Sequence, residues 1–335
     1  MRKIKGIISI LLVSIISLII IVFLMSKTPL NTLYQIFIGP LNSKYFFGNT
    51  LSHTAPLIIS AIAISIAFRA NLINLGGDGQ MYFGAIIANI VAIYLSPIGK
   101  LSIIFALIAA SLVGGFIAFI SAYLKVKLDT PELISSYLIS IAISYFASYL
   151  VTGPLQDPNS NLQSTRKVQY MLSKIFLPSN LSTSIIYALI IAVLFYFIFT
   201  KTKFGYETKL IGFNKEFARY GGISISKNYL LSFTLSGALI AFAGGIYIFG
   251  NYQSVYKDFA SGLGFSALTV ALIATNNPLG IIPIAFFISL INQGSIIAMQ
   301  NSDISSDVAL LFQAIIFLLI TSKTLIGEKY DNRTK

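Results

Sequence analysis

The segment Gly6 to Met25, GIISILLVSIISLIIIVFLM, determines the class of the fold. An α-helix needs about 20 apolar residues to cross a hydrocarbon core of about 30 Å. This segment reaches that length without a charged side chain, and similar runs follow at 229–250 and 308–320. The sequence therefore predicts a membrane protein built from helices.

The composition agrees with lipid as the solvent. Hydrophobic residues make up 56% of the chain, charged residues only 10%, and the mean hydropathy is +0.83. The net charge of +12 comes from short basic clusters between apolar runs. Clusters of this kind orient spans in the membrane, and they form no continuous basic face for nucleic acid. The chain has no cysteine and one histidine, so we expect no disulfide, metal or cofactor site.

The hydropathy pattern predicts an all-α polytopic bundle of about ten transmembrane helices within one domain, residues 1–335. Arg2, Lys3 and Lys5 precede the first span, which lacks a cleavage signature, so we expect an uncleaved span and a cytoplasmic N-terminus. Ten spans place most basic residues, and the C-terminus, in the cytoplasm as well. The expected spans are 7–25, 50–68, 79–97, 101–124, 132–152, 182–200, 229–250, 263–275, 279–299 and 307–326.

Small residues recur at four-residue spacing within the spans. They include Gly237, Ala241 and Gly245 in one span, and Gly114 and Ala118 in another. In lipid such faces let helix backbones approach closely, although ordinary membrane composition is an alternative explanation.

The outer connection, 153–181, carries apolar residues at helical spacing, from Val168 through Leu172 to Phe176. The spacing predicts an amphipathic helix in an extracytoplasmic loop. We expect it to lie in the membrane interface, with docking of a soluble partner as the alternative.

The inner connection, 201–228, is longer than a plain linker between spans requires. Asn214 is placed to cap a short helix from Lys215 to Tyr220, which Gly221 or Gly222 would end. A folded cytoplasmic segment indicates a protein contact, and a solvated basic anchor is the alternative.

The polar stretch from Asn71 to Gln80 lies where the second span ends and the third begins. Its clustered glycines disfavour a regular helix, and backbone that is not helical survives at membrane depth only against protein or water. Asn74, Gly76, Asp78 and Gln80 are therefore candidates for a solute pathway or gate. An ordinary cytoplasmic turn with a helix cap remains the alternative.

The sequence carries no recognisable catalytic motif. It lacks the Gly-x-x-x-x-Gly-Lys-Ser/Thr loop that cradles a nucleotide and any Ser, His and Asp arrangement, so we expect no enzyme here and ATP hydrolysis on a separate subunit. His53 is expected to be an interfacial polar residue. Span centres almost free of ionisable residues argue against a proton-driven carrier.

Four segments of this sequence resemble permease subunits of bacterial ABC importers of the ribose and nucleoside type. They are the stretch 69–80, the segment 202–222, the small-residue helix 235–245, and the C-terminal part that begins at Gly262. The stretch 69–80 together with Pro131 and Glu132 is more similar to the nucleoside branch. The sequence departs from the family at Asp78, where glutamate is usual, and at Pro131, where histidine is usual.

The resemblance implies a type II ABC importer-like permease that imports nucleosides across the bacterial plasma (inner) membrane. It implies a cytoplasmic ATP-binding subunit, a second homologous permease in a heterodimer, an extracytoplasmic solute-binding lipoprotein, surrounding lipid and no nucleic acid. A monosaccharide such as ribose or galactose is the alternative solute, and a standalone carrier or channel the alternative class. The implied ATPase-coupling residues are Gly212, Asn214, Ala218, Gly221, Gly222 and Ile223.

Overall fold

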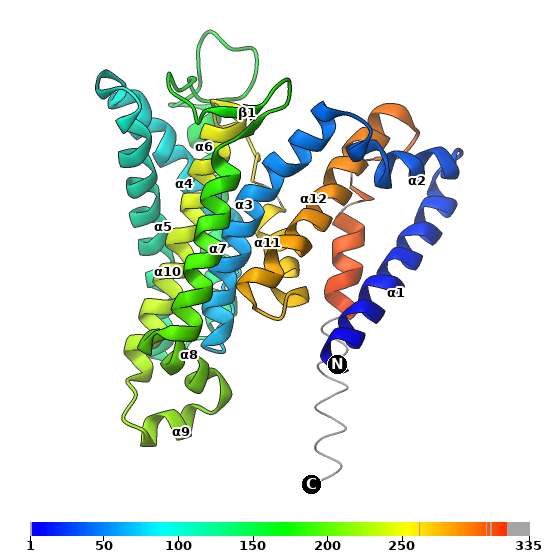
Figure 1. Cartoon of the computed structure of the whole chain (residues 1–335). Helices are drawn as coiled ribbons and strands as arrows, with labels where there is room; N and C mark the ends of the chain where they lie inside the picture. Colours follow the sequence, from blue (N-terminus) through cyan, green and yellow to red (C-terminus); the bar gives the residue numbers. More distant parts are fainter. Residues whose placement is uncertain (1, 261, 306, 309, 320–335) are drawn as a thin grey trace. The chain divides into compact units, whose positions relative to one another are not determined.

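The computed structural model describes residues 2–319 except 261, 306 and 309, and most of them are helical (Figure 1). The helices are α1 Arg2–Met25, α2 Pro29–Phe37, α3 Lys44–Arg69, α4 Gly77–Tyr94, α5 Leu101–Leu128, α6 Glu132–Thr152, α7 Ser184–Lys201, α8 Lys203–Phe213, α9 Lys215–Tyr220, α10 Ile225–Tyr247, α11 Leu263–Ile273 and α12 Pro278–Asn301. The short strands β1 Lys174–Phe176 and β2 Leu181–Ser182 pair antiparallel. A π-helical turn, Ile248–Tyr252, continues α10.

Within the described residues, six helices are long and apolar enough to cross a membrane, which confirms the predicted all-α membrane bundle. They are Lys44–Arg69, Leu101–Leu128, Glu132–Thr152, Ser184–Lys201, Ile225–Tyr252 and Pro278–Asn301. Shorter apolar helices, at Leu12–Met25, Leu263–Ile273 and Leu310–Leu319, fall on three further predicted spans. The 18-residue α4 falls on another. The count of ten is thus matched approximately, and the last predicted span extends outside the described residues.

The chain divides into two compact units. One comprises Leu51–Ala285, and the other comprises Met1–Thr50 with Phe286–Lys335. The boundaries fall inside α3 and α12, so each of these helices contributes to both units. The expectation of one domain over the whole chain stays a prediction.

In the smaller unit, Asp303 joins the end of α1 to the turn that follows α12. Its carboxylate accepts hydrogen bonds from the Ser26 hydroxyl and the Lys27 N–H, each at 2.6 Å. These donors, the Ser26 hydroxyl foremost, hold the pKa of the Asp303 carboxyl below its ordinary value. Nearby, Asn31 donates to the Asn301 carbonyl at 3.1 Å, so two segments far apart in sequence are fastened together.

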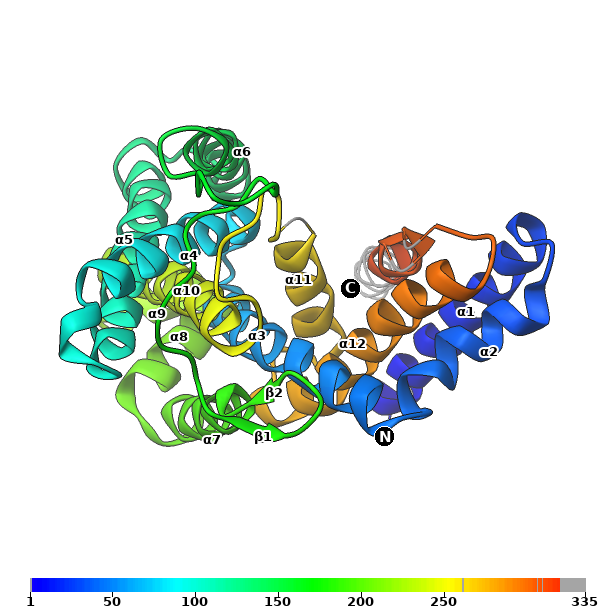
Figure 2. The ribbon, with the colours of Figure 1, turned by 90° about the horizontal axis from the view of Figure 1, so that it is seen from above.

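The larger unit is built around α10, which packs against α4 and α5 through small residues (Figures 1 and 2). A Cβ added to Gly114 would lie 2.6 Å from the Gly237 carbonyl oxygen, and one added to Gly84 would lie 2.6 Å from the Ala241 Cα. Backbones this close leave no room for larger side chains. The structure thus confirms that the small-residue spacing marks packing faces.

The prediction of an amphipathic helix between 153 and 181 is wrong. The segment that follows Thr165 is extended, and its N–H groups bond outside the segment: Val168 donates to Gln253 at 2.8 Å and Leu172 to Phe249 at 3.0 Å. These bonds to the chain that follows α10 replace the bonds a helix would make. Val168 and Leu172 are buried, so their spacing reflects contact with the core and not a helical face.

We predict that Gly237→Ala destabilises the larger unit by about 1–3 kcal/mol, because its methyl group would overlap Ala118 and the Gly114 carbonyl. Gly280→Ala is the matched control, since a Cβ there makes ordinary contacts at 3.6 Å. Thermal unfolding of the purified proteins in detergent measures the difference. Equal unfolding temperatures for the two variants would contradict the close α5–α10 packing.

Candidate functional site

The non-helical stretch between α3 and α4 begins with a left-handed residue. Asn71 has φ 58°, and the Leu72 N–H bonds to the Ala67 carbonyl at 3.0 Å. This geometry ends a helix, and asparagine is one of the few residues besides glycine that adopt it readily. The chain then runs without helix to Gly77, where α4 begins.

Asn74 organises a buried polar network inside this stretch. Its Nδ2 donates to Gln80 Oε1 at 3.1 Å and to Ser236 Oγ at 3.0 Å, while its Oδ1 accepts from the Gly76 N–H at 2.8 Å. Gln80 also donates back to Asn74 Oδ1 at 3.2 Å. Both amide side chains are only 1% exposed. The two residues therefore hold the stretch in shape, and their predicted role in a gate stays a prediction.

The glycines allow this stretch to approach other helices. A Cβ on Gly77 would lie 2.8 Å from the Gly264 Cα, and one on Gly79 would lie 2.8 Å from the Ser140 Cα. A Cβ on Gly76 would overlap the Gln80 amide. Glycine at these positions thus brings the start of α4 against both α11 and α6.

Asp78 caps the N-terminus of α11. Its Oδ1 accepts the Gly264 N–H at 2.7 Å and its Oδ2 the Gly262 N–H at 3.3 Å. A carboxylate at this position satisfies free N–H groups and interacts favourably with the helix dipole. The side chain also borders two cavities.

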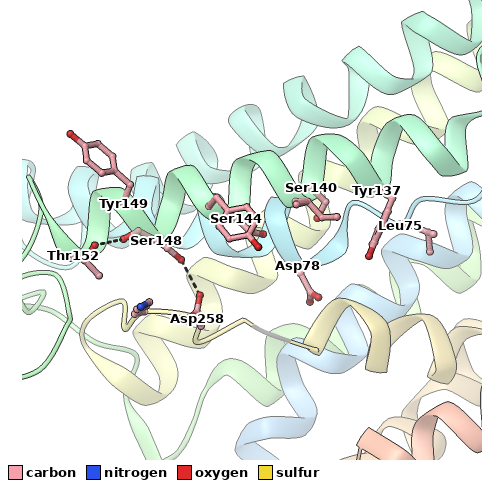
Figure 3. A pocket seen from close by; sticks show the side chains of 12 residues that line it. Leu75, Asp78, Tyr137, Ser140, Ser144, Ser148, Tyr149, Thr152 and Asp258 are labelled. Carbon is pink, nitrogen blue, oxygen red and sulfur yellow. Dashed lines mark hydrogen bonds between the residues drawn. The ribbon is translucent and has the colours of Figure 1, made fainter.

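The larger of these cavities has a volume of about 670 Å³ and lies along one face of α6 (Figure 3). A volume of this size suits a small organic solute. Eight residues of α6 line it at helical spacing: Tyr137, Ser140, Ile141, Ser144, Tyr145, Ser148, Tyr149 and Thr152. The remaining lining residues are Leu75, Asp78, Lys257 and Asp258. Hydroxyls, tyrosine rings and two carboxylates thus face a common space.

The sequence analysis did not identify this face of α6. Its signal was present, because Ser140, Ser144 and Ser148 recur every four residues inside a helix that is largely apolar. A polar stripe of this period in a membrane span points to the bundle interior or a water-filled cavity. Asp258 carried no such signal, because only the fold of its loop brings it to the cavity. Among the described residues, no group of three or more His, Asp or Glu is arranged to hold a metal.

The second candidate region, 201–228, contains α8 and α9. The Asn214 side chain caps α9 by accepting the Phe217 N–H at 3.0 Å, as predicted. The helix ends with Gly222 at φ 75° and a bond from the Ile223 N–H to the Ala218 carbonyl at 3.1 Å. The structure therefore confirms the capped helix Lys215–Tyr220.

Several residues implied to couple this segment to an ATPase are packed inside the protein and support the fold of the segment. Ala218 is 1% exposed, and Gly212 packs so tightly on the Arg69 carbonyl that a Cβ would overlap it. The exposed face instead carries aromatic side chains: Phe213 is 91% exposed, Tyr220 90% and Phe217 62%. These three residues were missed from the sequence, and a surface of this kind is typical of a protein contact.

Arg69 joins the two candidate regions. Gly212 of α8 packs against the Arg69 backbone. The Arg69 guanidinium donates two hydrogen bonds to the Asn276 carbonyl, at 3.2 Å from Nε and at 3.0 Å from a terminal nitrogen. The guanidinium also lies 4.1 Å from the centre of the Phe199 ring. The polar stretch that leads to Asp78 starts directly after this residue.

Comparison with known proteins adds independent findings. The family model described as branched-chain amino acid transport system, permease component, matches residues 46–321. The probable riboflavin import permease protein RfuC of Treponema pallidum is 32% identical, covering 96% of this chain and 86% of its own. The nucleoside ABC transporter permease protein NupB of Lactococcus lactis is 29% identical (92% and 87%), and the guanosine ABC transporter permease protein NupP of Bacillus subtilis 29% (86% and 84%).

We predict that Asn74→Ala lowers the stability of the protein by about 1–3 kcal/mol, because it leaves the Gln80 amide, the Gly76 N–H and the Ser236 hydroxyl short of a partner. Asn42→Ala, at an exposed position, is the control. Thermal unfolding in detergent provides the measurement. A variant that unfolds like the wild type yet transports nothing would support a gate role for Asn74 and contradict the structural one.

Proposed function

The chain belongs to the family of branched-chain amino acid transport system permease components, and on this premise we propose that it is the permease subunit of an ATP-driven nucleoside importer. The observation that carries the choice of solute is the cavity along α6. There tyrosine rings, serine hydroxyls and carboxylates line one space of about 670 Å³.

This lining matches the chemistry of a nucleoside. A planar base stacks on an aromatic ring such as that of Tyr145, and ribose hydroxyls bond to serine hydroxyls and to carboxylate oxygens. Relatives named for nucleosides and for guanosine support the same solute class. A monosaccharide, the alternative solute, would leave the aromatic rings without a flat partner. A standalone carrier, the alternative class, has no use for a cytoplasmic docking element such as α9.

In this proposal, α9 and the end of α8 contact a cytoplasmic ATP-binding subunit through Phe213, Phe217 and Tyr220. A second homologous permease pairs with this chain, and an extracytoplasmic binding protein delivers the solute. The assembly lies in the bacterial plasma membrane, with both termini of this chain and the connection 201–228 in the cytoplasm.

The proposed route of coupling follows packed residues. Gly212 rests on the Arg69 backbone, and Ile211 and Ala218 share a buried cluster with Leu72 and Phe233. A displacement of α9 therefore shifts the start of the polar stretch, and through it Asp78 at the cavity. Asn74, Gly76, Asp78 and Gln80 retain their proposed role as the pathway or gate segment.

We predict that cells expressing the complete importer take up radiolabelled adenosine and that excess unlabelled nucleoside abolishes this uptake. Excess ribose would leave uptake unchanged, because ribose offers the hydroxyls without a base to stack. Riboflavin serves as a third competitor, since one relative is named for its import. Inhibition by ribose alone would establish the monosaccharide alternative, and uptake by liposomes that hold only this chain would establish a carrier.

We predict that the double variant Phe213→Ser with Tyr220→Ser loses at least 90% of uptake, a tenfold effect of the size expected for interface anchors. Its folding should be unaffected, because both side chains are solvent-exposed. The control is Tyr94→Ser, which is 80% exposed on another helix. The chain has no cysteine, so a single Phe217→Cys allows site-specific cross-linking, and failure to reach an ATP-binding subunit would contradict the docking role.

A further inference from the structure

Asp258 adopts a left-handed backbone conformation beside the cavity. Its φ is 57°, a conformation that L-residues rarely adopt and that aspartate adopts more readily than most. Its N–H donates to the Tyr82 hydroxyl at 3.1 Å, and the neighbouring Lys257 N–H donates to the Gln163 carbonyl at 3.0 Å. The surrounding structure thus holds the Asp258 carboxylate in one direction.

The carboxylate bonds directly to α6 and borders the cavity. Its Oδ1 accepts the Ser148 hydroxyl at 2.9 Å, and Figure 3 shows Asp258 and Asp78 on the same side of this helix. Ser148 lies two helical turns beyond Ser140, which accepts the Gly79 N–H at 2.9 Å next to Asp78. At 1.5 Å per residue, the two serines are about 12 Å apart along the helix axis. The cavity therefore has an acidic group toward each end.

The two carboxylates differ in how many of their oxygens already accept hydrogen bonds from the protein. Both oxygens of Asp78 accept backbone N–H groups of the α11 cap. Asp258 uses one oxygen for Ser148, and no hydrogen bond to its Oδ2 occurs among the described residues. An ionised carboxylate only accepts hydrogen bonds, so the open oxygen selects a ligand that donates. Nearby Tyr145, 76% exposed, offers a ring for stacking.

We propose that Asp258 is the specificity-determining residue of the cavity and binds vicinal hydroxyl groups of a solute whose planar aromatic ring stacks on Tyr145. This inference rests on the proposed function, because it assumes that the solute passes through the cavity. The hydroxyls could belong to the ribose of a nucleoside or to the polyol chain of a flavin, and the two sources are separated by experiment.

The test measures equilibrium binding of radiolabelled adenosine, 2′,3′-dideoxyadenosine and riboflavin. The protein is the importer's membrane complex in lipid nanodiscs without its external binding protein, so that only the cavity selects. Asp258→Asn keeps the shape and an acceptor for Ser148, and Asp258→Gly removes the side chain while accepting the positive φ. We expect each variant to weaken adenosine binding about tenfold or more and to leave dideoxyadenosine binding unchanged.

Asp129→Asn is the matched control, because Asp129 is also an aspartate with positive φ, 51°, but lies outside the cavity lining. Unchanged preference for adenosine in both Asp258 variants would overturn the inference, as would equal loss of all three ligands, which marks a structural role. A wild-type complex that imports adenosine in cells but binds none in nanodiscs would also overturn it, while leaving the proposed function intact. If only riboflavin shows the Asp258 effect, the inference stands and the nucleoside assignment fails.

Discussion

The arrangement of the larger unit depends on one constraint: lipid offers no hydrogen bonds to backbone that is not helical. The stretch from Asn71 to Gly76 and the first turn of α4 therefore take some of their partners from side chains of another helix. Ser136 of α6 accepts the Leu75 N–H at 3.1 Å, and Ser140 accepts the Gly79 N–H at 2.9 Å. These bonds fix the rotation of α6 about its axis relative to the non-helical stretch. The serines that continue the same face, further along α6, then necessarily line the cavity.

The polar side chains of this motif have two separate roles. Asn74, held by Gln80 and Ser236, keeps the stretch buried, and Asp78 follows it at the first turn of α4. The network and the carboxylate thus perform different tasks within one motif. The amides stabilise the shape of the break, and the acid reaches out to another helix at the edge of the cavity.

Sequence reasoning reached the class of the fold, the small-residue packing and the capped α9, because each depends on local pattern. It failed for the segment around Val168, where bonds to Gln253 and Phe249 override an apparently helical spacing. Ala218 and Gly212, which the resemblance implies in coupling to an ATPase, are covered by the protein itself, and their role in coupling stays a prediction. Which residues face outward depends on tertiary packing, and motif resemblance alone does not contain that information.

The short helix α11 is held at both ends by residues that flank the non-helical stretch from Asn71 to Gly76. Its 11 residues span about 16 Å, too short for a membrane of about 30 Å. Asp78 holds its N-terminus, and Arg69 donates to the Asn276 carbonyl just beyond its C-terminus. A negative group at the start and a positive group at the end both interact favourably with the helix dipole. Because Arg69 and Asp78 flank the same stretch, any change in its length or direction acts on α11 at both ends. The glycine-rich stretch therefore joins α8, which packs on Arg69, to the cavity that Asp78 borders, as the proposed route of coupling requires.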